Sequence, residues 1–127
     1  MLSDSPAVAF IAASDLGLAR AFYEGVLGLA ILSHDDFAVV ADAGGVRIRI
    51  TQPPELVTAP YTVLGFAVAD IAAEVASLTA RGVVFERYAW FGEAQDETGV
   101  WATPDGGGQV AWLKDPDGDL LSLSAST

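Results

Sequence analysis

One pattern occurs twice in this chain, and it constrains the fold more than any other feature of the sequence. In each copy an apolar run leads to an aspartate, then to an apolar stripe, then to a glycine. The aspartates, Asp15 and Asp70, lie 55 residues apart, and the glycines are Gly28 and Gly82. Aspartate is a preferred residue at the N-terminus of a helix and glycine commonly follows its C-terminus. The pattern therefore predicts two modules that each begin with a strand and a helix.

Both predicted helices carry apolar residues at the i, i+3, i+4, i+7 spacing of an amphipathic helix. The stripes consist of Ala19, Phe22, Tyr23 and Val26 in the first helix, and Ile71, Val75 and Leu78 in the second. The apolar runs before them, residues 8–13 and 63–68, have the length and composition of strands.

Further extended runs follow each helix. After the first come LAILSH, FAVVAD and GVRIRIT, the last two joined by a turn at Ala43-Gly44-Gly45. After the second come VVFERYA, TGVWATP, QVAWLKD and DLLSLSA, with turns at residues 104–108 and 115–118. Residues 51–60 hold three prolines and no sustained period, which is typical of a linker.

These elements predict an α+β fold of two tandem β-α-β-β-β modules that arose by internal duplication. We expect the modules at about residues 6–52 and 61–125, joined by a linker at 53–60, within a single domain 1–127. Apolar residues make up 52% of the chain, which is enough for a sizeable core.

The charge of the chain limits its partners. There are 17 acidic and 6 basic residues, for a formal net charge of −11, so we expect no binding to nucleic acid or to anionic membranes. The acidity fits either a solvated surface or a groove for a cationic ligand. There is no cysteine, no apolar run of membrane-spanning length and no visible signal peptide, which predicts a cytoplasmic protein.

Three stretches resemble a known family in order and in content: DLGLARAFYEGVLGL, VADIAAEVASLTARG and WLKDPDGDLLSLS. They are similar to the vicinal oxygen chelate superfamily, which includes glyoxalase I, extradiol dioxygenases, and bleomycin- and fosfomycin-resistance proteins. The resemblance covers nearly the whole chain. It implies that the curved mixed sheets of the two modules form a shared cup, and that the chain forms a homodimer. It does not specify a function, because this fold hosts several kinds of enzyme and also binding proteins.

The resemblance also implies where a divalent metal would be held. The family's four ligand positions, commonly His, Gln or Glu, correspond here to Val8, Ile48 or Arg49, Leu64 and Ser122. Valine and leucine have no donor atom, arginine is cationic, and a neutral serine hydroxyl is a weak ligand. The chain has one histidine, His34, so a site with two histidines from one chain is impossible. We therefore expect no metal and no other cofactor, although an all-carboxylate magnesium site stays open.

Strand alternation then predicts the residues that line the cup. If Val8 faces the cup, Phe10 does so too, and the same reasoning selects Leu64 and Phe66. The full predicted ligand site is Phe10, Arg47, Arg49, Leu64, Phe66, Trp101 and Ser122.

Arg47 and Arg49 stand two residues apart on one strand, with Ile48 and Ile50 on the other face. Guanidinium groups bind carboxylate or phosphate through two hydrogen bonds, so the pair predicts an anion clamp. The alternatives are a solvated strand face, or pairing with acids of a neighbouring strand.

Aromatic residues gather in residues 87–101, which include Tyr88, Trp90, Phe91 and Trp101. Such a group suits a small-molecule pocket, but Trp101 and Trp112 could equally belong to the core. Asp96 or Glu97 could act as a general base if buried. His34, beside Asp35-Asp36 in an apparent turn, is expected to be solvated.

Three functions remain open at this point. We favour a metal-free protein that binds a small, partly aromatic or anionic molecule, with drug-sequestering resistance proteins as the family model. The second is an enzyme: a glyoxalase-like lyase or dioxygenase with atypical metal ligands, or a metal-independent isomerase or hydrolase. The third is an interaction module whose dimer groove matters more than its cup.

Overall fold

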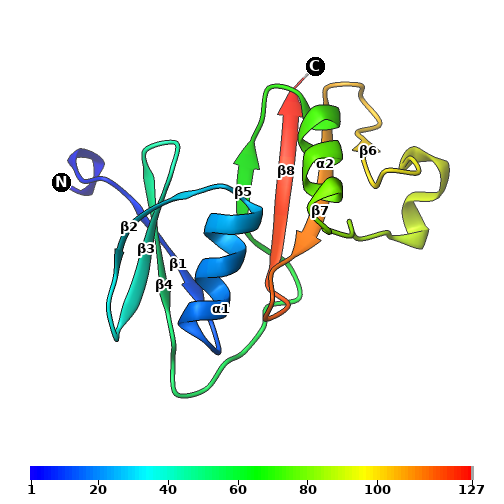
Figure 1. Cartoon of the computed structure of the whole chain (residues 1–127). Coiled ribbons are helices and arrows are strands. Elements are labelled where there is room, and N and C mark those ends of the chain that lie inside the picture. Colours follow the sequence, from blue (N-terminus) through cyan, green and yellow to red (C-terminus); the bar gives the residue numbers. More distant parts are fainter. Residues whose placement is uncertain (127) are drawn as a thin grey trace. The chain divides into compact units, whose positions relative to one another are not determined.

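The structure is a computed structural model that describes residues 1–126 of the chain. It contains two compact units, Met1–Thr58 and Ala59–Thr127, and each is described here by itself. Figure 1 shows that each unit consists of one sheet with helical segments against it.

The first unit contains a mixed four-stranded sheet in the order β1-β4-β3-β2. β1 is parallel to β4, and the other neighbours are antiparallel. Its elements in chain order are η1 (Leu2–Asp4), β1 (Val8–Ala12), α1 (Leu16–Arg20), η2 (Ala21–Val26), β2 (Ala30–His34), β3 (Ala38–Ala43) and β4 (Val46–Thr51).

The second unit contains a sheet with the corresponding order, β5-β8-β7-β6, and β5 is parallel to β8. The predicted α+β fold of two tandem β-α-β-β-β modules is therefore confirmed, while the shared cup stays a prediction. The elements are β5 (Thr62–Ala67), α2 (Ile71–Ala80), η3 (Ala89–Ala94), β6 (Trp101–Ala102), β7 (Gly108–Lys114) and β8 (Leu120–Ser126).

The two helices begin as the repeated pattern predicts. Asp15 Oδ1 accepts the backbone N–H of Leu18 at 2.8 Å, and Asp70 Oδ1 accepts that of Ala73 at 3.1 Å. Each bond satisfies an N–H group that has no partner within the helix.

The first helix differs from the prediction in its second half. After Arg20 the chain continues as a π-helix, η2, with a bond from the N–H of Leu27 to the carbonyl oxygen of Phe22. A π-turn holds more residues than an α-turn, so the predicted 3.6-residue stripe does not continue through it. Tyr23 is fully buried, whereas Phe22 and Val26 are half-buried.

The predicted strand VVFERYA does not form, and this prediction was wrong. The segment makes one backbone bond to β7, from the N–H of Glu86 to the carbonyl oxygen of Trp112 at 2.8 Å. The side-chain amide of Gln95 occupies two more of its backbone groups, because it donates to the carbonyl oxygen of Glu86 at 2.8 Å and accepts the N–H of Tyr88 at 2.9 Å. Groups held by a side chain do not contribute to a strand ladder.

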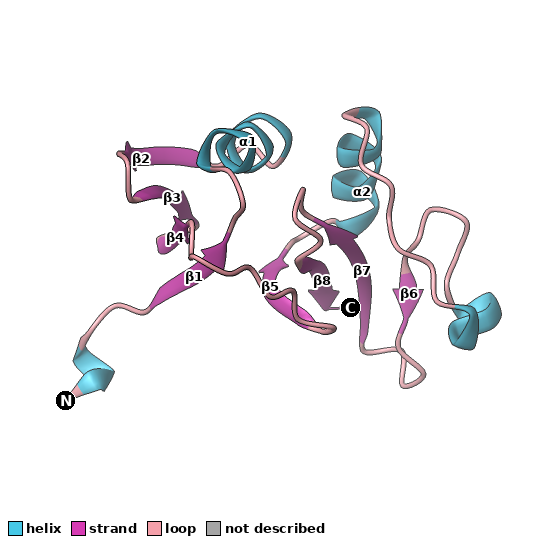
Figure 2. Cartoon of the chain, turned by 90° about the horizontal axis from the view of Figure 1, so that it is seen from below, coloured by secondary structure: helices cyan, strands magenta, loops and turns pink. Residues whose placement is uncertain are grey.

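Each sheet is covered on one face by its helix (Figures 1 and 2). In the first unit, Ile48 and Ile50 of β4 are fully buried together with Tyr23. In the second, Leu113 of β7 and Leu121 of β8 are buried on the face that α2 covers. The opposite face of each sheet carries the polar and aromatic side chains that concern function. None of the helices in residues 1–126 is long and apolar enough to cross a membrane.

Candidate functional site

The second sheet has a face of hydroxyl, small and aromatic side chains, which we call the serine face. Ser122 pairs in register with Trp112 on one side and with Gly65 on the other, so their side chains share one face. The neighbours on either side of Ser122 in β8, Leu121 and Leu123, are buried under α2. The serine face consists of Gly65, Ala67, Trp101, Val110, Trp112, Ser122 and Ser124.

Leu64 and Phe66 do not lie on the serine face, and this part of the predicted site was wrong. Thr62 pairs with Leu120, but Leu64 pairs with Leu121, so one extra residue is inserted in β5. Such a bulge moves every following side chain to the other face. Phe66 pairs in register with Leu123 and consequently shares the face of the buried Leu121 and Leu123.

The same bulge brings Gly65 next to Ser122. A Cβ atom at position 65 would lie 2.8 Å from Ser122 Oγ, which is closer than such atoms approach in proteins. The absence of a side chain at Gly65 therefore leaves room for the Ser122 hydroxyl.

Five aromatic rings border the serine face and form what we call the aromatic cluster: Tyr88, Trp90, Phe91, Trp101 and Trp112. Phe91 stacks on Trp101 at 4.6 Å and on Trp112 at 5.5 Å between ring centroids, with interplanar angles of 20° and 15°. Tyr88 and Trp90 stack on each other at 4.7 Å. Tyr88 meets Phe91 at 84° and Trp112 at 81°, whereas Trp90 is tilted by 55° from Phe91, so the two stacks meet edge to face at Tyr88.

The exposure of these rings distinguishes a pocket from a core. Trp101 and Trp112 are half-buried, and Trp90 is 76% exposed. Rings that stack on one another and still present surface to solvent have free faces on which a further flat group can stack. Burial, followed by the nearby charge of Glu86, raises the pKa of the Tyr88 phenol, so this ring stays neutral.

Gln95 fixes the loop that carries the cluster, and sequence reasoning did not identify it as a functional residue. Its side chain is 4% exposed, and its amide bonds three backbone groups, those of Glu86, Tyr88 and Gly99, at 2.8 to 2.9 Å. No spacing or motif distinguishes this glutamine from an exposed one, because its partners come from three separate positions in the loop.

The two carboxyl groups considered as a general base have other roles. Asp96 Oδ1 accepts the N–H of Thr98, the hydroxyl of Thr98 and the N–H of Val100, at 2.6 to 3.0 Å. Burial raises the pKa of Asp96, but these hydrogen bonds outweigh it and the pKa is lowered. Asp96 therefore stabilises a turn as a charged acceptor. Glu97 is exposed and lines a groove beside α2.

The first sheet has a face with two guanidinium groups, which we call the arginine face. Arg49 of β4 lies in register between Phe10 and Val40, and Arg47 lies between Val8 and Asp42. The predicted alternation of this strand is confirmed, since Ile48 and Ile50 are buried on the other face. Phe10 is 65% exposed, and Arg49 is half-buried beside it.

Acidic groups lie near both arginines. Asp42 is directly opposite Arg47, and the backbone N–H groups of Phe37 and Ala38 lower the pKa of Asp35, with a smaller contribution from Arg49. Within residues 1–126, however, the side chains of Arg47 and Arg49 make no hydrogen bond and no ion pair. Their charges are thus partly balanced while their donors stay available to a ligand.

His34 contacts a neighbouring helix residue at the surface. Its Nδ1 lies 3.1 Å from Nη1 of Arg20, which also bonds Glu24 through Nε at 3.2 Å. Arginine only donates, so His34 Nδ1 is the acceptor and carries no proton in this arrangement.

The positions expected to bind a metal do not fit one. Val8 and Leu64 lack donor atoms, and the bulge separates Leu64 from the face of Ser122. In the described part of the chain, no three His, Asp or Glu side chains are grouped to hold a metal ion. The absence of a metal cofactor stays a prediction.

Comparisons with solved structures agree with the fold. A putative glyoxalase family protein from Bacillus anthracis is 17% identical, with a TM-score of 0.74 over 97% of this chain and 95% of that chain. FosX, a fosfomycin resistance protein from Listeria monocytogenes, is 17% identical, with a TM-score of 0.74 over 95% and 92%. TnmS3, an antibiotic binding protein from a Streptomyces species, is 20% identical, with a TM-score of 0.73 over 96% and 95%. At these identities the likeness extends to the fold alone.

A comparison with curated proteins finds no match. A family model, in contrast, matches residues 6–123, which is nearly the whole chain. The matched range includes the first sheet and the second sheet up to residue 123 in β8. The chain belongs to the Glyoxalase/Bleomycin resistance protein/Dioxygenase superfamily.

Proposed function

We propose that this chain binds a small molecule with a flat aromatic body, and that the aromatic cluster and the serine face hold that body. The observation that carries the proposal is the pair of stacks that meet edge to face at Tyr88, which leave indole and phenol surface exposed beside two serine hydroxyls. A hollow of about 450 Å³ at one end of the serine face, lined by Ala67, Val110 and Ser124 among others, has the size of a ligand pocket.

The chemistry of this face suits recognition without catalysis. Stacked or edge-to-face aromatic pairs contribute about 0.5–1.5 kcal/mol each beyond the burial of their area. Ser122 and Ser124 add hydroxyls that both donate and accept, which suits a carbonyl or hydroxyl substituent on the ligand. The residues of the serine face include no carboxylate and no imidazole, and the carboxylate of Asp96 is engaged in its own turn.

A separate anion site on the arginine face of the first unit is the second part of the proposal. Arg49, with Arg47 less directly, would bind a carboxylate or a phosphate, and Phe10 supplies adjacent apolar surface. A charge-assisted hydrogen bond contributes about 1.5–3 kcal/mol. Arg49→Ala should therefore weaken an anionic ligand by roughly ten- to a hundred-fold and leave a neutral analogue almost unaffected.

The superfamily also contains metal-dependent enzymes, and a lyase or dioxygenase is the alternative function. We favour binding because the expected ligand positions carry Val8, Leu64 and Ser122. The likeness to TnmS3, an antibiotic binding protein, supports sequestration of a drug as one form of this function. We also expect the chain to form a homodimer, which sedimentation equilibrium would test.

Three naphthalene derivatives with the same ring test the proposal by calorimetry: 2-naphthoate, 2-naphthamide and 2-naphthylmethylamine. We expect all three to bind to the aromatic cluster, and the anionic one to bind to the arginine face as well. Trp101→Leu should lower the affinity for each of the three compounds about ten-fold, since it removes one stacking surface. Tyr61→Leu, at an exposed aromatic residue outside the cluster, is the matched control. Equal affinity of the Trp101 and Tyr61 variants would refute the role of the cluster. Preference for the amine, unchanged in Arg49→Ala, would refute the anion clamp.

A further inference from the structure

A groove of about 660 Å³ lies in the second unit, beside α2 and away from the serine face. We propose that it is a second ligand site, which binds an aliphatic carboxylate of medium chain length. The site does not depend on the function proposed above, and its residues belong neither to the serine face nor to the aromatic cluster.

The walls of the groove are apolar and mostly aliphatic. α2 buries Ile71 and Leu78, and it presents small side chains on its outer side, among them Ala72, Ala76 and Ala80. Val83, Val84 and Phe85 form the other wall, in the segment that was expected to be a strand. Val84 is 81% exposed, which is unusual for a large aliphatic side chain and leaves its surface available to an apolar ligand.

The segment that forms this wall separates the groove from the aromatic cluster. Phe85 and Arg87 line the groove. Glu86 pairs with Lys114 at 3.3 Å, and Tyr88 contacts Trp112, so these alternate side chains point to the serine face. A ligand in the groove therefore contacts α2 and Arg87, and it does not contact the tryptophan rings.

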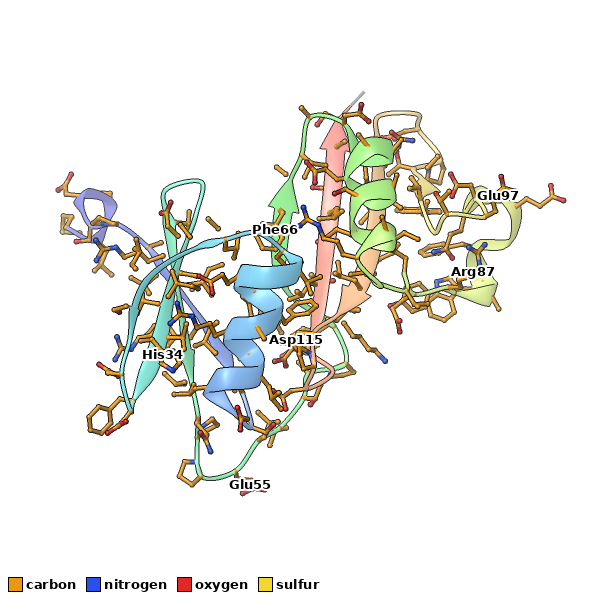
Figure 3. All side chains as sticks on the ribbon, in the orientation of Figure 1. His34, Glu55, Phe66, Arg87, Glu97 and Asp115 are labelled. Atoms are coloured by element: carbon orange, nitrogen blue, oxygen red, sulfur yellow. The ribbon has the colours of Figure 1, made fainter. Side chains whose placement is uncertain are left out.

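The charges beside the groove indicate the head group. Arg87 and Glu97 line it from the segments before and after η3 (Figure 3). Arg87 makes one long hydrogen bond, from Nη2 to the carbonyl oxygen of Gln95 at 3.4 Å. Within the described residues it has no carboxylate partner, so its other donors are available to the two oxygens of a ligand carboxylate. Glu97 opposes an anion, and its removal should therefore strengthen binding.

The length of the groove indicates the tail. The small residues from Ala72 to Ala80 span eight helical steps, or about 12 Å at the rise of an α-helix. An extended eight-carbon chain with its carboxylate is of comparable length. Each methylene that leaves water adds about four-fold to affinity, so octanoate should bind about fifteen-fold more tightly than hexanoate.

Titration of ¹⁵N-labelled protein with octanoate tests this site. We expect shifts of the amide signals of Ala72, Ala76 and Val84, with little change at the indole signals of the tryptophans. Arg87→Gln should lower the affinity for octanoate about ten-fold, and Glu97→Gln should raise it several-fold. Arg20→Gln, a substitution outside the groove with the same change of charge as Arg87→Gln, should have little effect. Octan-1-ol and octylamine should bind more weakly than octanoate.

Several results would overturn the proposal. One is the absence of any shift of these amide signals at millimolar octanoate. The others are tighter binding of octylamine than of octanoate, and equal octanoate affinity in Arg87→Gln and Arg20→Gln. Shifts of the same amides with protein concentration alone would mean that a second copy of the chain covers the groove, and would also overturn it. Naphthoate binding has no bearing on these outcomes, so this inference and the proposed function fail separately.

Discussion

The turn between β7 and β8 contains a buried acidic group whose removal should stabilise the protein. Asp115 Oδ1 accepts the backbone N–H groups of Asp117 and Asp119 at 3.0 and 2.9 Å, which draws the turn tight (Figure 3). Asp119 is 6% exposed, and its Oδ2 is buried with no hydrogen-bond partner among residues 1–126. Burial and the neighbouring carboxyl group of Asp115 raise the pKa of Asp119 from 3.8 to about 6.

The direction of the pH effect follows from this pKa. Between about pH 4 and pH 6 the folded protein holds a proton on Asp119 that the unfolded chain has released, so the free energy of unfolding falls as pH rises through this window. Above about pH 6 the stability that this proton contributes is lost almost entirely. A shift of about two units at 1.36 kcal/mol per unit gives a penalty of about 3 kcal/mol at neutral pH.

Asp119→Asn removes the charge and keeps the size and the backbone bonds. At about pH 7.5 the variant should be more stable than the parent by about 2–3 kcal/mol, and at about pH 4 the two should differ by less than about 0.5 kcal/mol. Urea denaturation followed by tryptophan fluorescence measures this difference. Asp36→Asn, at an exposed position, corrects for the change in net charge. Parallel stability curves for Asp119→Asn and the parent between these pH values would refute the reasoning.

Three further predictions concern the loop and the cofactor. Gly99→Ala should destabilise the fold by about 2–4 kcal/mol, because Gly99 has φ 102° and a Cβ there would lie 2.7 Å from Phe85 Cβ; thermal denaturation that leaves the midpoint unchanged would contradict this. Gln95→Leu should abolish much of the near-ultraviolet circular dichroism of the aromatic cluster while the far-ultraviolet spectrum is kept, since it releases three backbone groups; retention of the near-ultraviolet signal would count against the role of Gln95. Elemental analysis of dialysed protein should find no stoichiometric divalent metal, and one metal ion per chain would disprove the expectation.

The sequence was sufficient to predict the fold because its local signals agree with one another. The two aspartate caps, the glycines after the helices and the turn at Gly44-Gly45 each act over a few residues, and each has one structural meaning. Alternation in β4 was read correctly because Ile48 and Ile50 differ so clearly in polarity from Arg47 and Arg49.

The candidate site was predicted only in part, because its errors come from interactions that local patterns do not contain. The bulge in β5 cannot be read from Thr-Val-Leu-Gly-Phe, where both faces would carry apolar residues. Its effect is to exchange Leu64 and Phe66 for Gly65 and Ala67 beside Ser122. The loop was mistaken for a strand because the amide of Gln95, rather than a neighbouring strand, bonds its backbone.

The central claim is that the aromatic cluster holds a flat ligand, and the indole signals of the protein test it most directly. The chain has three tryptophans, Trp90, Trp101 and Trp112, and all of them belong to the cluster. In a ¹H–¹⁵N spectrum, titration with 2-naphthoate should move their three indole N–H signals together and saturably, through ring currents of the bound naphthalene. Saturable binding by calorimetry with unmoved indole signals would contradict the account, because the ligand would then lie elsewhere.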